Sequence, residues 1–276
     1  MSSQPPAGRT RLAPTITSWG SLWRRKLPLG ALVTYAVSVV LGVALWWLVS
    51  LRYSDYFLPS PLTTFEAGRE LASDGTLGAS IVASAQRILI GWALGVLVGV
   101  PVGLLMGQVL LIRRALDPYI QFFRFIPPIA FVTLAIIWFG VGEASKVVLI
   151  FYTTVFIIVI STTAGVLAVE ESRLRAAASL GAGPTRTLLS VILPSTMPYV
   201  VTGSRLAMGN SFLTVVSAEI VAAEQGLGAL IWTSRNYGRT DWVFVGIVVL
   251  GLMGFVFDRA IRFSVVRLFG RYAVKV

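Results

Sequence analysis

A few charged and polar residues lie inside long apolar stretches of the sequence, where they can act on a passing solute. Arg124 stands near the start of one such stretch, three residues before Pro127. Arg205, Asn210 and Glu219 fall together in another. An ionisable residue inside a membrane is costly to keep, so it is by default a functional candidate. We therefore predict that these five residues line a translocation pathway, in which Arg124 and Arg205 attract anions.

Each charged residue also has a structural alternative. Arg124 can instead extend its side chain to the cytoplasmic interface and serve no solute. Arg205 and Glu219 are 14 residues apart, which is roughly 21 Å along a helix. We expect them near opposite ends of their span and unpaired with each other, where helix packing is as good an explanation as a pathway.

Several kinds of chemistry are excluded by residues that the sequence lacks. It contains no cysteine and no histidine, which removes disulfides, Cys/His metal sites, cysteine nucleophiles and Ser-His arrangements. None of Lys26, Lys146 and Lys275 follows a glycine, so no phosphate-binding P-loop is present. We expect no catalytic residue, no bound metal and no cofactor of its own, and hydrolysis of ATP must come from a partner.

The elements that position these residues are six apolar segments. Of the 276 residues 56% are hydrophobic and only 13% charged, whereas soluble domains have about 25% charged residues. A bilayer core needs roughly 20 apolar residues in a helix. The candidate spans are Leu29–Leu51, Ile88–Ile112, Tyr119–Val141, Val147–Val169, Tyr199–Ala222 and Trp242–Phe257. The sequence therefore predicts an all-α polytopic membrane protein with six transmembrane helices.

The basic residues indicate the orientation of these spans. The net charge is +11, and if the N-terminus is cytoplasmic, 15 of the 23 Lys and Arg residues fall in inner segments and 6 in outer ones. This distribution follows the positive-inside rule, so it predicts two cytoplasmic termini rather than nucleic-acid binding. Residues 1–28 are polar and are expected to be a flexible cytoplasmic segment with Trp19 and Trp23 at the interface, followed by a transmembrane domain over residues 29–276.

Two further patterns concern helix packing and the outer surface. The second span carries glycines with a strict period of four, at Gly91, Gly95, Gly99, Gly103 and Gly107. Such a stripe lets another helix approach closely, either for static packing or for sliding during a transport cycle, and Pro101 permits a kink. In the outer segment 52–85 we expect a short amphipathic helix over Pro61–Ser73.

A polar interruption lies between the fourth and fifth spans, over residues 170–198. The stretch "EESRLRAAASLGAG" contains helix formers that are stopped by Gly181 and Gly183. Pro184 can open a second helix, which we expect Pro194 and Pro198 to end before the membrane is re-entered. The sequence thus predicts a helix–turn–helix hairpin at the cytoplasmic surface, suited to docking in a groove of another protein.

This hairpin resembles the cytoplasmic signature loop of ABC-importer permeases, in which a Glu-Ala-Ala motif is followed by glycine and later by an apolar-apolar-Pro motif. Ala176, Ala177, Gly181, Leu193 and Pro194 match that pattern, whereas Arg175 stands where the family usually has Glu. The blocks "LPSPLTTF", "IPPIAFVTLAIIWFGVGEASK" and "SAEIVAAEQGLGALI" are similar to the nitrate/sulfonate/taurine/bicarbonate branch of these permeases. The resemblance covers the chain from about Leu29 to Arg271.

The resemblance implies a type I importer fold and a division of labour among subunits. It implies a second permease subunit, most simply another copy of this chain, a dimer of ABC ATPase subunits that binds ATP and Mg, and a periplasmic or lipid-anchored substrate-binding protein, in a bacterial inner membrane. The outer Gly226-Leu227-Gly228 segment is expected to face that binding protein. The expected ATPase-coupling residues are Arg175, Ala176, Ala177, Ser179, Leu180, Gly181, Ala182 and Pro194.

The predicted function is therefore the translocation subunit of an ATP-driven importer for a small polar or anionic solute. Sulfonates, nitrate, bicarbonate and pyrimidine-type vitamin precursors all fit the resemblance. An ion-gradient-driven secondary transporter is the main alternative, although it would not need the hairpin. A membrane-embedded lipid-modifying enzyme is a weaker alternative, because the inner loops offer few acidic residues and no histidine.

Overall fold

The computed structural model describes residues 28–269 of the chain, and this part contains helices and turns but no strand. The expected interfacial segment with Trp19 and Trp23 lies outside the described residues. The chain divides into two units, residues 1–52 and residues 53–276. In the first unit, α1 (Pro28–Ser50) occupies the predicted first span, and it carries no charged residue.

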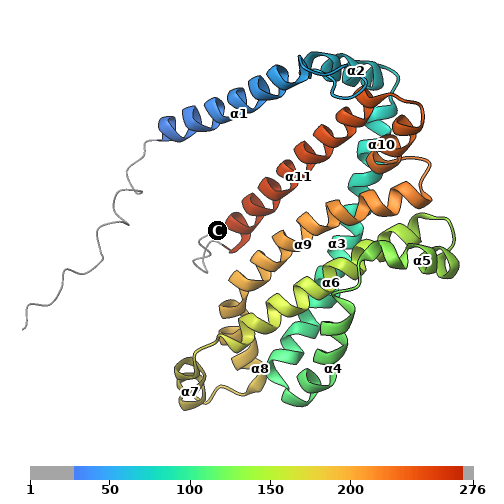
Figure 1. Ribbon diagram of the computed structural model, residues 1–276. Coiled ribbons are helices and arrows are strands. Elements are labelled where there is room, and N and C mark those ends of the chain that lie inside the picture. The colour runs from blue at the N-terminus through green and yellow to red at the C-terminus, as the bar shows by residue number, and fades with distance from the viewer. Residues whose placement is uncertain (1–27, 270–276) are drawn as a thin grey trace, which may run out of the picture. The chain divides into compact units, whose positions relative to one another are not determined.

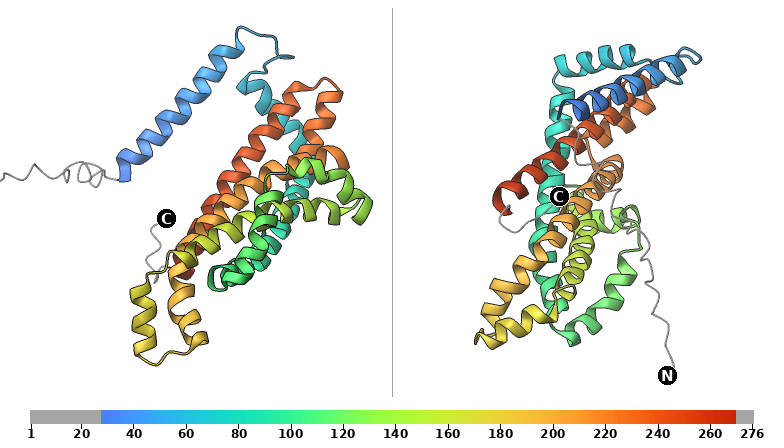
Figure 2. Two further views of the ribbon diagram at one scale, coloured as in Figure 1. Left: turned by 60° about the horizontal axis from the view of Figure 1, so that its bottom comes forward. Right: turned by 90° about the vertical axis from the view of Figure 1, so that its left-hand side faces the viewer.

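Four long helices run through the second unit: α3 (Thr76–Gln108), α6 (Glu143–Leu167), α9 (Leu193–Ala222) and α11 (Thr240–Phe269). Figure 1 shows α7 (Glu171–Ser179) and α8 (Pro184–Thr187) at one end of this unit. The opposite end carries α2 (Pro61–Ser73) and α10 (Leu227–Asn236), as the two further views in Figure 2 also show. The predicted short helix over Pro61–Ser73 is confirmed.

Four helices in the described part are long and apolar enough to cross a membrane, and the number rises to six if each of two bent helix pairs counts as one span. The prediction of six spans agrees with the larger number. One pair joins α9 to α10 with a bend of 52°. The other joins α4 (Leu110–Phe123) to η1 (Pro128–Phe131) and α5 (Val132–Phe139), with a bend of 91°.

The third span, predicted over Tyr119–Val141, is broken at Pro127 and Pro128, as two consecutive prolines near the start of a span predict. Its helix ends at Phe123 and resumes at Pro128 in a new direction. Pro127 has the extended conformation of a residue that precedes proline, with φ −60° and ψ 138°. Pro127 and Pro128 both lack an N–H for a helical hydrogen bond. The two consecutive prolines therefore turn one expected span into two helices with an irregular segment between them.

The glycine stripe of α3 packs directly on α6. A Cβ atom added at Gly91 would lie 2.6 Å from the Cβ of Ile150, and one added at Gly99 would lie 2.8 Å from that of Ile158. Gly95, Gly103 and Gly107 meet Thr154, Thr162 and Val166 in the same way. Each glycine thus faces a bulkier residue of α6, and these α6 residues follow one another at intervals of four. The stripe therefore provides the close helix packing that was predicted.

The chain between the hairpin and the fifth span differs from the prediction, because Pro194 and Pro198 do not end a helix. Instead α8 leads through a π-helical segment, η2 (Leu188–Ile192), directly into α9. Pro194 lies in the first turn of α9. A π-helical turn is wider than an α-helical one, which gives room for the proline ring beside the carbonyl four residues earlier. The helix is consequently continuous from the hairpin to Ala222.

Candidate functional site

The irregular segment between α4 and η1 has its exposed carbonyl groups satisfied from α6. The hydroxyl of Tyr152 donates a hydrogen bond to the carbonyl of Phe123, and it lies 3.4 Å from the carbonyl of Ile126. Non-helical backbone at membrane depth is tolerated where it is buried in protein or lines a cavity. Tyr152 thus allows the broken helix to persist beside an open space.

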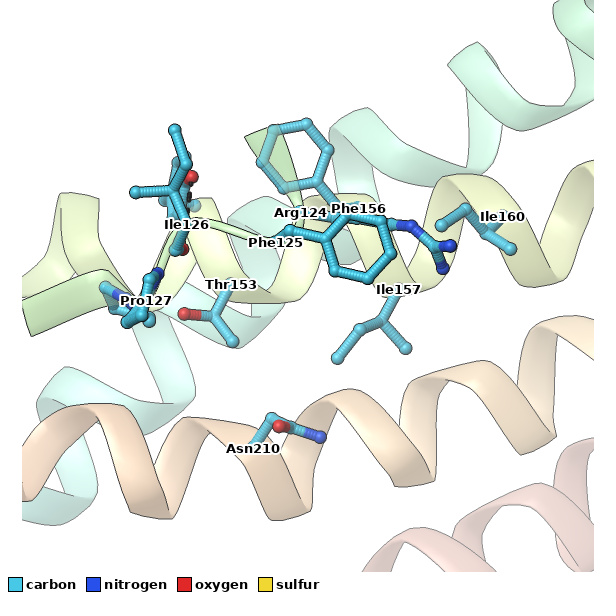
Figure 3. Close-up of a pocket in the computed structure, with 11 residues that line it drawn as sticks. Arg124, Phe125, Ile126, Pro127, Thr153, Phe156, Ile157, Ile160 and Asn210 are labelled. Carbon is cyan, nitrogen blue, oxygen red and sulfur yellow. Dashed lines mark hydrogen bonds between the residues drawn. The ribbon is translucent and has the colours of Figure 1, made fainter. Parts of the chain in front are cut away.

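That open space is a pocket of about 300 Å³ between the broken helix, α6 and α9. Figure 3 shows Arg124 and Pro127 on the broken segment, Thr153 on α6 and Asn210 on α9 around this space. The rest of its lining is apolar or aromatic: Phe125, Ile126, Pro128, Phe156, Ile157 and Ile160 together with the ring of Tyr152. Three of the five predicted pathway residues, Arg124, Pro127 and Asn210, therefore come together.

Arg124 carries the single charge of this pocket lining. Its guanidinium carbon lies 4.5 Å from the centre of the Phe125 ring, in a cation–π contact. Within residues 28–269, no carboxylate lies within ion-pair distance of it. The amide of Asn210 donates to the carbonyl of Leu206 at 3.1 Å, and the hydroxyl of Thr153 lies 2.9 Å from that of Thr214.

Glu219 does not belong to the pocket, because it is fully buried in a separate cluster of four charged residues. We call this set the four-charge cluster: Arg87 of α3, Glu143 and Lys146 of α6, and Glu219 of α9. Arg87 binds Glu143 through two nitrogens, at 2.5 and 2.7 Å, and Glu219 at 2.7 Å. Lys146 lies 3.0 Å from Glu143. Two cations and two anions thus balance one another.

Glu219 also holds the start of α10. One of its carboxylate oxygens accepts a hydrogen bond from the backbone N–H of Gly228 at 2.8 Å, and Ser84 donates to the other at 2.7 Å. Ser84 in turn accepts from the N–H of Leu227 at 2.9 Å. Gly226 has a φ of +137° and packs against the Glu219 carboxylate, where a Cβ would lie 2.5 Å from each oxygen. These contacts satisfy N–H groups that a helix start leaves unpaired.

These contacts bear on two expectations about this region. Gly226, Leu227 and Gly228 are buried, whereas Glu224 and Gln225 before them are exposed. Only the exposed part of this loop is therefore open to a binding protein, and that contact stays a prediction. Glu219 is a packing residue, as the structural alternative proposed, and it does not line the pocket. Sequence reasoning missed Arg87, Glu143 and Lys146, because the predicted spans begin at Ile88 and Val147 and leave all three residues outside the membrane. The available signal was their position, because these three residues and Glu219 all lie at or near the outer ends of the predicted spans.

Arg205 also lies away from the pocket and is paired. Its guanidinium forms two hydrogen bonds with Asp258 of α11, at 2.8 and 3.1 Å. Both side chains are partly exposed, at 30% and 40%. The expectation that Arg205 would not pair with Glu219 is correct, but its partner was not foreseen, because the predicted last span ends at Phe257, one residue before Asp258. A carboxylate that already neutralises Arg205 makes this residue a poor anion site.

The hairpin has a well-defined shape. At the end of α7 the N–H of Ala182 bonds to the carbonyl of Ala177 at 3.0 Å, and that of Gly181 to Ala178 at 2.9 Å. With Gly181 at a φ of +73°, this is a Schellman motif, which explains why glycine stands there. Leu180, beside it, is 85% exposed. A pocket of about 480 Å³ opens between α7 and the chain leading into α9, with Ala176, Leu180, Arg186 and Pro194 among its lining residues.

The remaining predicted coupling residues lie on the same hairpin. Arg175 forms an i,i+4 ion pair with Glu171 at 3.0 Å, and both side chains are exposed. The hydroxyl of Ser179 donates to the carbonyl of Arg175 at 3.0 Å. Ala176 and Ala177 both line the pocket, and Ala177 is largely buried. The structure thus brings all eight predicted coupling residues together, although what they bind stays a prediction.

Comparison with known proteins supplies the family. A family model described as "Binding-protein-dependent transport system inner membrane component" matches residues 99–270. The chain is 37% identical to the taurine transport system permease protein TauC of Escherichia coli (strain K12), over 87% of this chain and 90% of that protein. It is 31% identical to the bicarbonate transport system permease protein CmpB of Synechococcus elongatus, over 86% and 88%. The nitrate import permease protein NrtB of Synechococcus elongatus is 29% identical over 87% and 91%.

A solved structure supports the same fold. The chain is similar to a chain of the MetNI methionine ABC transporter in an inward-facing conformation, with a TM-score of 0.58 and 19% identity, over 68% of this chain and 95% of that one. The expected type I importer fold is confirmed. Because the family model matches more than half of its length and curated permeases align over most of it, this chain belongs to the binding-protein-dependent transport system inner membrane components, the permease subunits of ABC importers.

Proposed function

We propose that this permease subunit carries a small oxyanion or sulfonate and is driven by a separate ATPase dimer that docks on the α7 hairpin. The relatives named for taurine, nitrate and bicarbonate transport support the class of solute, because all three solutes carry a negatively charged oxygen-bearing group. ATP and Mg are bound by the ATPase, while an external binding protein delivers the solute. A second copy of this chain completes the membrane domain.

The observation that carries the docking proposal is the exposed tip of the hairpin. Leu180 is a large apolar residue with 85% of its surface exposed, at the end of a helix with a Schellman cap and beside a pocket. An apolar side chain on a rigid protrusion suits a groove in another protein. The positive-inside rule favours a cytoplasmic hairpin and two cytoplasmic termini, which is the side where ATP is available.

Replacing Leu180 tests the docking proposal. In the complete transporter reconstituted in liposomes, Leu180→Glu places a charge in the proposed contact without disturbing a buried group. We expect ATP-driven uptake to fall at least tenfold, as for loss of an interface residue worth about 2 kcal/mol. Ser172→Glu adds the same charge at the other end of α7, where the side chain is exposed, and should leave uptake near wild type.

The result also separates ATP-driven transport from the main alternative. Gly181→Val is expected to uncouple ATP hydrolysis from uptake, because a β-branched residue is strained at a positive φ. Uptake that proceeds without nucleotide would support an ion-gradient-driven transporter instead. Unchanged uptake in both Leu180→Glu and Gly181→Val would overturn the proposed docking site.

A further inference from the structure

We propose that Arg124, at the break between α4 and η1, makes the adjoining pocket selective for anions over cations. This inference rests on the proposed function in one respect only, that a solute passes through the membrane domain. The selectivity itself is a local electrostatic property of the pocket. It assigns a role to Arg124 that Arg205 and Arg87 do not share, although all three lie in or beside spans.

The three arginines differ in how their charge is compensated. Arg87 has two carboxylate partners, and Arg205 has one that binds it through two nitrogens. Arg124 has no carboxylate partner within residues 28–269, and its guanidinium rests on the face of Phe125. A guanidinium has five N–H donors in its plane, and a ring stacked on its face leaves the donors at its edge available. Arg124 can therefore offer a bidentate contact to an oxyanion.

The other polar groups around the pocket are engaged with protein. Tyr152 uses its hydroxyl on backbone carbonyls, and Thr153 uses its own on Leu149 and Thr214. Asn210 binds the carbonyl of Leu206 with one amide hydrogen, which leaves the second for a solute. Among the described residues that line the pocket, none is acidic and able to attract a cation. The pocket lining thus contains one charge without a counter-ion, and this charge is positive.

The apolar walls strengthen the effect of this charge. Phe125, Phe156, Ile157 and Ile160 line the side of the pocket along which the Arg124 side chain extends in Figure 3. A low-dielectric wall focuses the field of a charge into the adjacent water and raises the local concentration of the opposite ion. A snorkelling arginine, by contrast, would direct its charge to the lipid headgroups and leave the pocket unbiased.

A local chemical probe tests the charge of the pocket without knowledge of the solute. The chain has no cysteine, so Asn210→Cys introduces one reporter thiol on α9 opposite Arg124. The complete reconstituted transporter, with cysteine-free partner subunits, is treated with two thiol reagents of similar size, anionic 2-sulfonatoethyl methanethiosulfonate and cationic 2-trimethylammonioethyl methanethiosulfonate. The quantity measured is the ratio of the anionic to the cationic modification rate.

Removing the charge should change this ratio. At an assumed separation of about 8 Å and an effective dielectric constant of about 40, a unit charge contributes about 1 kcal/mol, which changes each rate roughly fivefold in opposite directions. We therefore expect Arg124→Gln to lower the ratio at least tenfold, and Arg124→Lys to restore most of it. Arg205→Gln, which removes an arginine that is already paired, should leave the ratio within about twofold of the reference. A second reporter, Ile157→Cys, repeats the measurement if Asn210→Cys impairs assembly.

The outcomes distinguish this inference from the proposed function. A ratio that Arg124→Gln leaves unchanged, in a transporter that still takes up solute with ATP, would overturn the role of Arg124 and leave the proposed function intact. A ratio that falls as much for Arg205→Gln as for Arg124→Gln would overturn it too, because the effect would then reflect overall charge. Loss of ATP-driven uptake in the unsubstituted chain would contradict the proposed function while the modification ratio remained measurable.

Discussion

The four-charge cluster and the pocket at the broken helix both place an arginine among membrane-spanning helices, but they use it in opposite ways. Arg87 is 5% exposed and is surrounded by carboxylates and a backbone carbonyl on three other segments. Arg124 is exposed to the pocket and touches an aromatic ring. A buried charge whose donors are engaged acts as a tie between helices. A positive charge without a counter-ion beside a pocket is available to bind an anion that enters the pocket.

The difference follows from what surrounds each residue. Around Arg87, α3, α6, α9 and the start of α10 converge, so that carboxylates and a carbonyl from several segments reach the guanidinium. Around Arg124 the helix itself is interrupted, and mostly apolar side chains reach the space. Regular, converging helices therefore produce a saturated network, whereas an interrupted helix leaves a charge uncompensated. This contrast can be tested by substitutions, beginning with the largest expected effect.

Removing one member of the four-charge cluster should be the most damaging change. Glu219→Ala leaves Arg87 with one carboxylate fewer in a buried site and leaves the N–H of Gly228 without its acceptor. We expect a loss of about 3–5 kcal/mol in the free energy of unfolding, seen as a lower melting temperature of the purified protein in detergent. The double variant Arg87→Met/Glu219→Leu should lose less free energy of unfolding than the sum of the losses in Arg87→Met and in Glu219→Leu. Additive losses would show that the cluster does not act as a unit.

Closing the glycine stripe should have a smaller but clear effect. In Gly99→Ala the new Cβ would lie 2.8 Å from that of Ile158, and the overpacked contact is expected to cost about 1–3 kcal/mol. The matched control is Gly251→Ala in α11, where nothing lies within 4 Å. There we expect a neutral change or a gain of about 0.5 kcal/mol from the lower backbone entropy of alanine. Equal melting temperatures for the two variants would contradict the close α3–α6 packing.

The Arg205–Asp258 pair is expected to matter little for stability. Because both side chains are partly exposed, Arg205→Gln should change the free energy of unfolding by about 0–1 kcal/mol. Uptake by the reconstituted transporter should stay within about twofold of wild type, in contrast to Arg124→Gln. If Arg205→Gln abolished uptake while the protein stayed folded, the distinction between a paired and an unpaired arginine would fail.

The smallest effect concerns the tie between α2 and the start of α11. A hydrogen bond from Arg239, and a second from Trp242, hold the pKa of Glu70 below its usual value. A lowered pKa means that the tie is present in full above the ordinary pKa of about 4.5 and is lost as the pH falls through the folded-state value. Hydrogen exchange in α2, relative to intrinsic rates, should therefore be constant from pH 7 to pH 5 and accelerate below about pH 4. Glu70→Gln should abolish this dependence, and an unchanged pH profile in that variant would assign it to another group.

Much of the fold could be predicted from local patterns. Continuous apolar segments indicated the spans, and Pro61 with the amphipathic residues that follow indicated both bounds of α2. The period-four glycines predicted close helix packing, since identical spacing puts them on one face. The turn at Gly181 was predicted as well, because a positive φ after a helix favours glycine. All of these features are determined by residues that lie close together in the sequence.

The candidate site could be predicted only in part, because its charges find partners far along the chain. Glu219 binds a residue 132 positions away, and Arg205 binds one 53 positions away. Hydropathy placed Arg87 just outside its span, so its burial was missed. Pro127 and Pro128 indicated a bend near Arg124 but not its direction, and hence not the pocket. The effect of Pro194 was misjudged, since a π-helical turn accommodates it.

The continuous helix from Pro184 to Ala222 makes α9 a lever. At about 1.5 Å per residue it is roughly 58 Å long, and it runs from the hairpin past Asn210 to Glu219. With its far end held by the four-charge cluster, a tilt of about 5° would move the hairpin end by about 5 Å over that length, while Asn210 at an intermediate position would move by a fraction of that. The wide turn at Leu188–Ile192 lies near the hairpin end, so a displacement applied to the hairpin would have to pass through this turn before it reached the pocket wall.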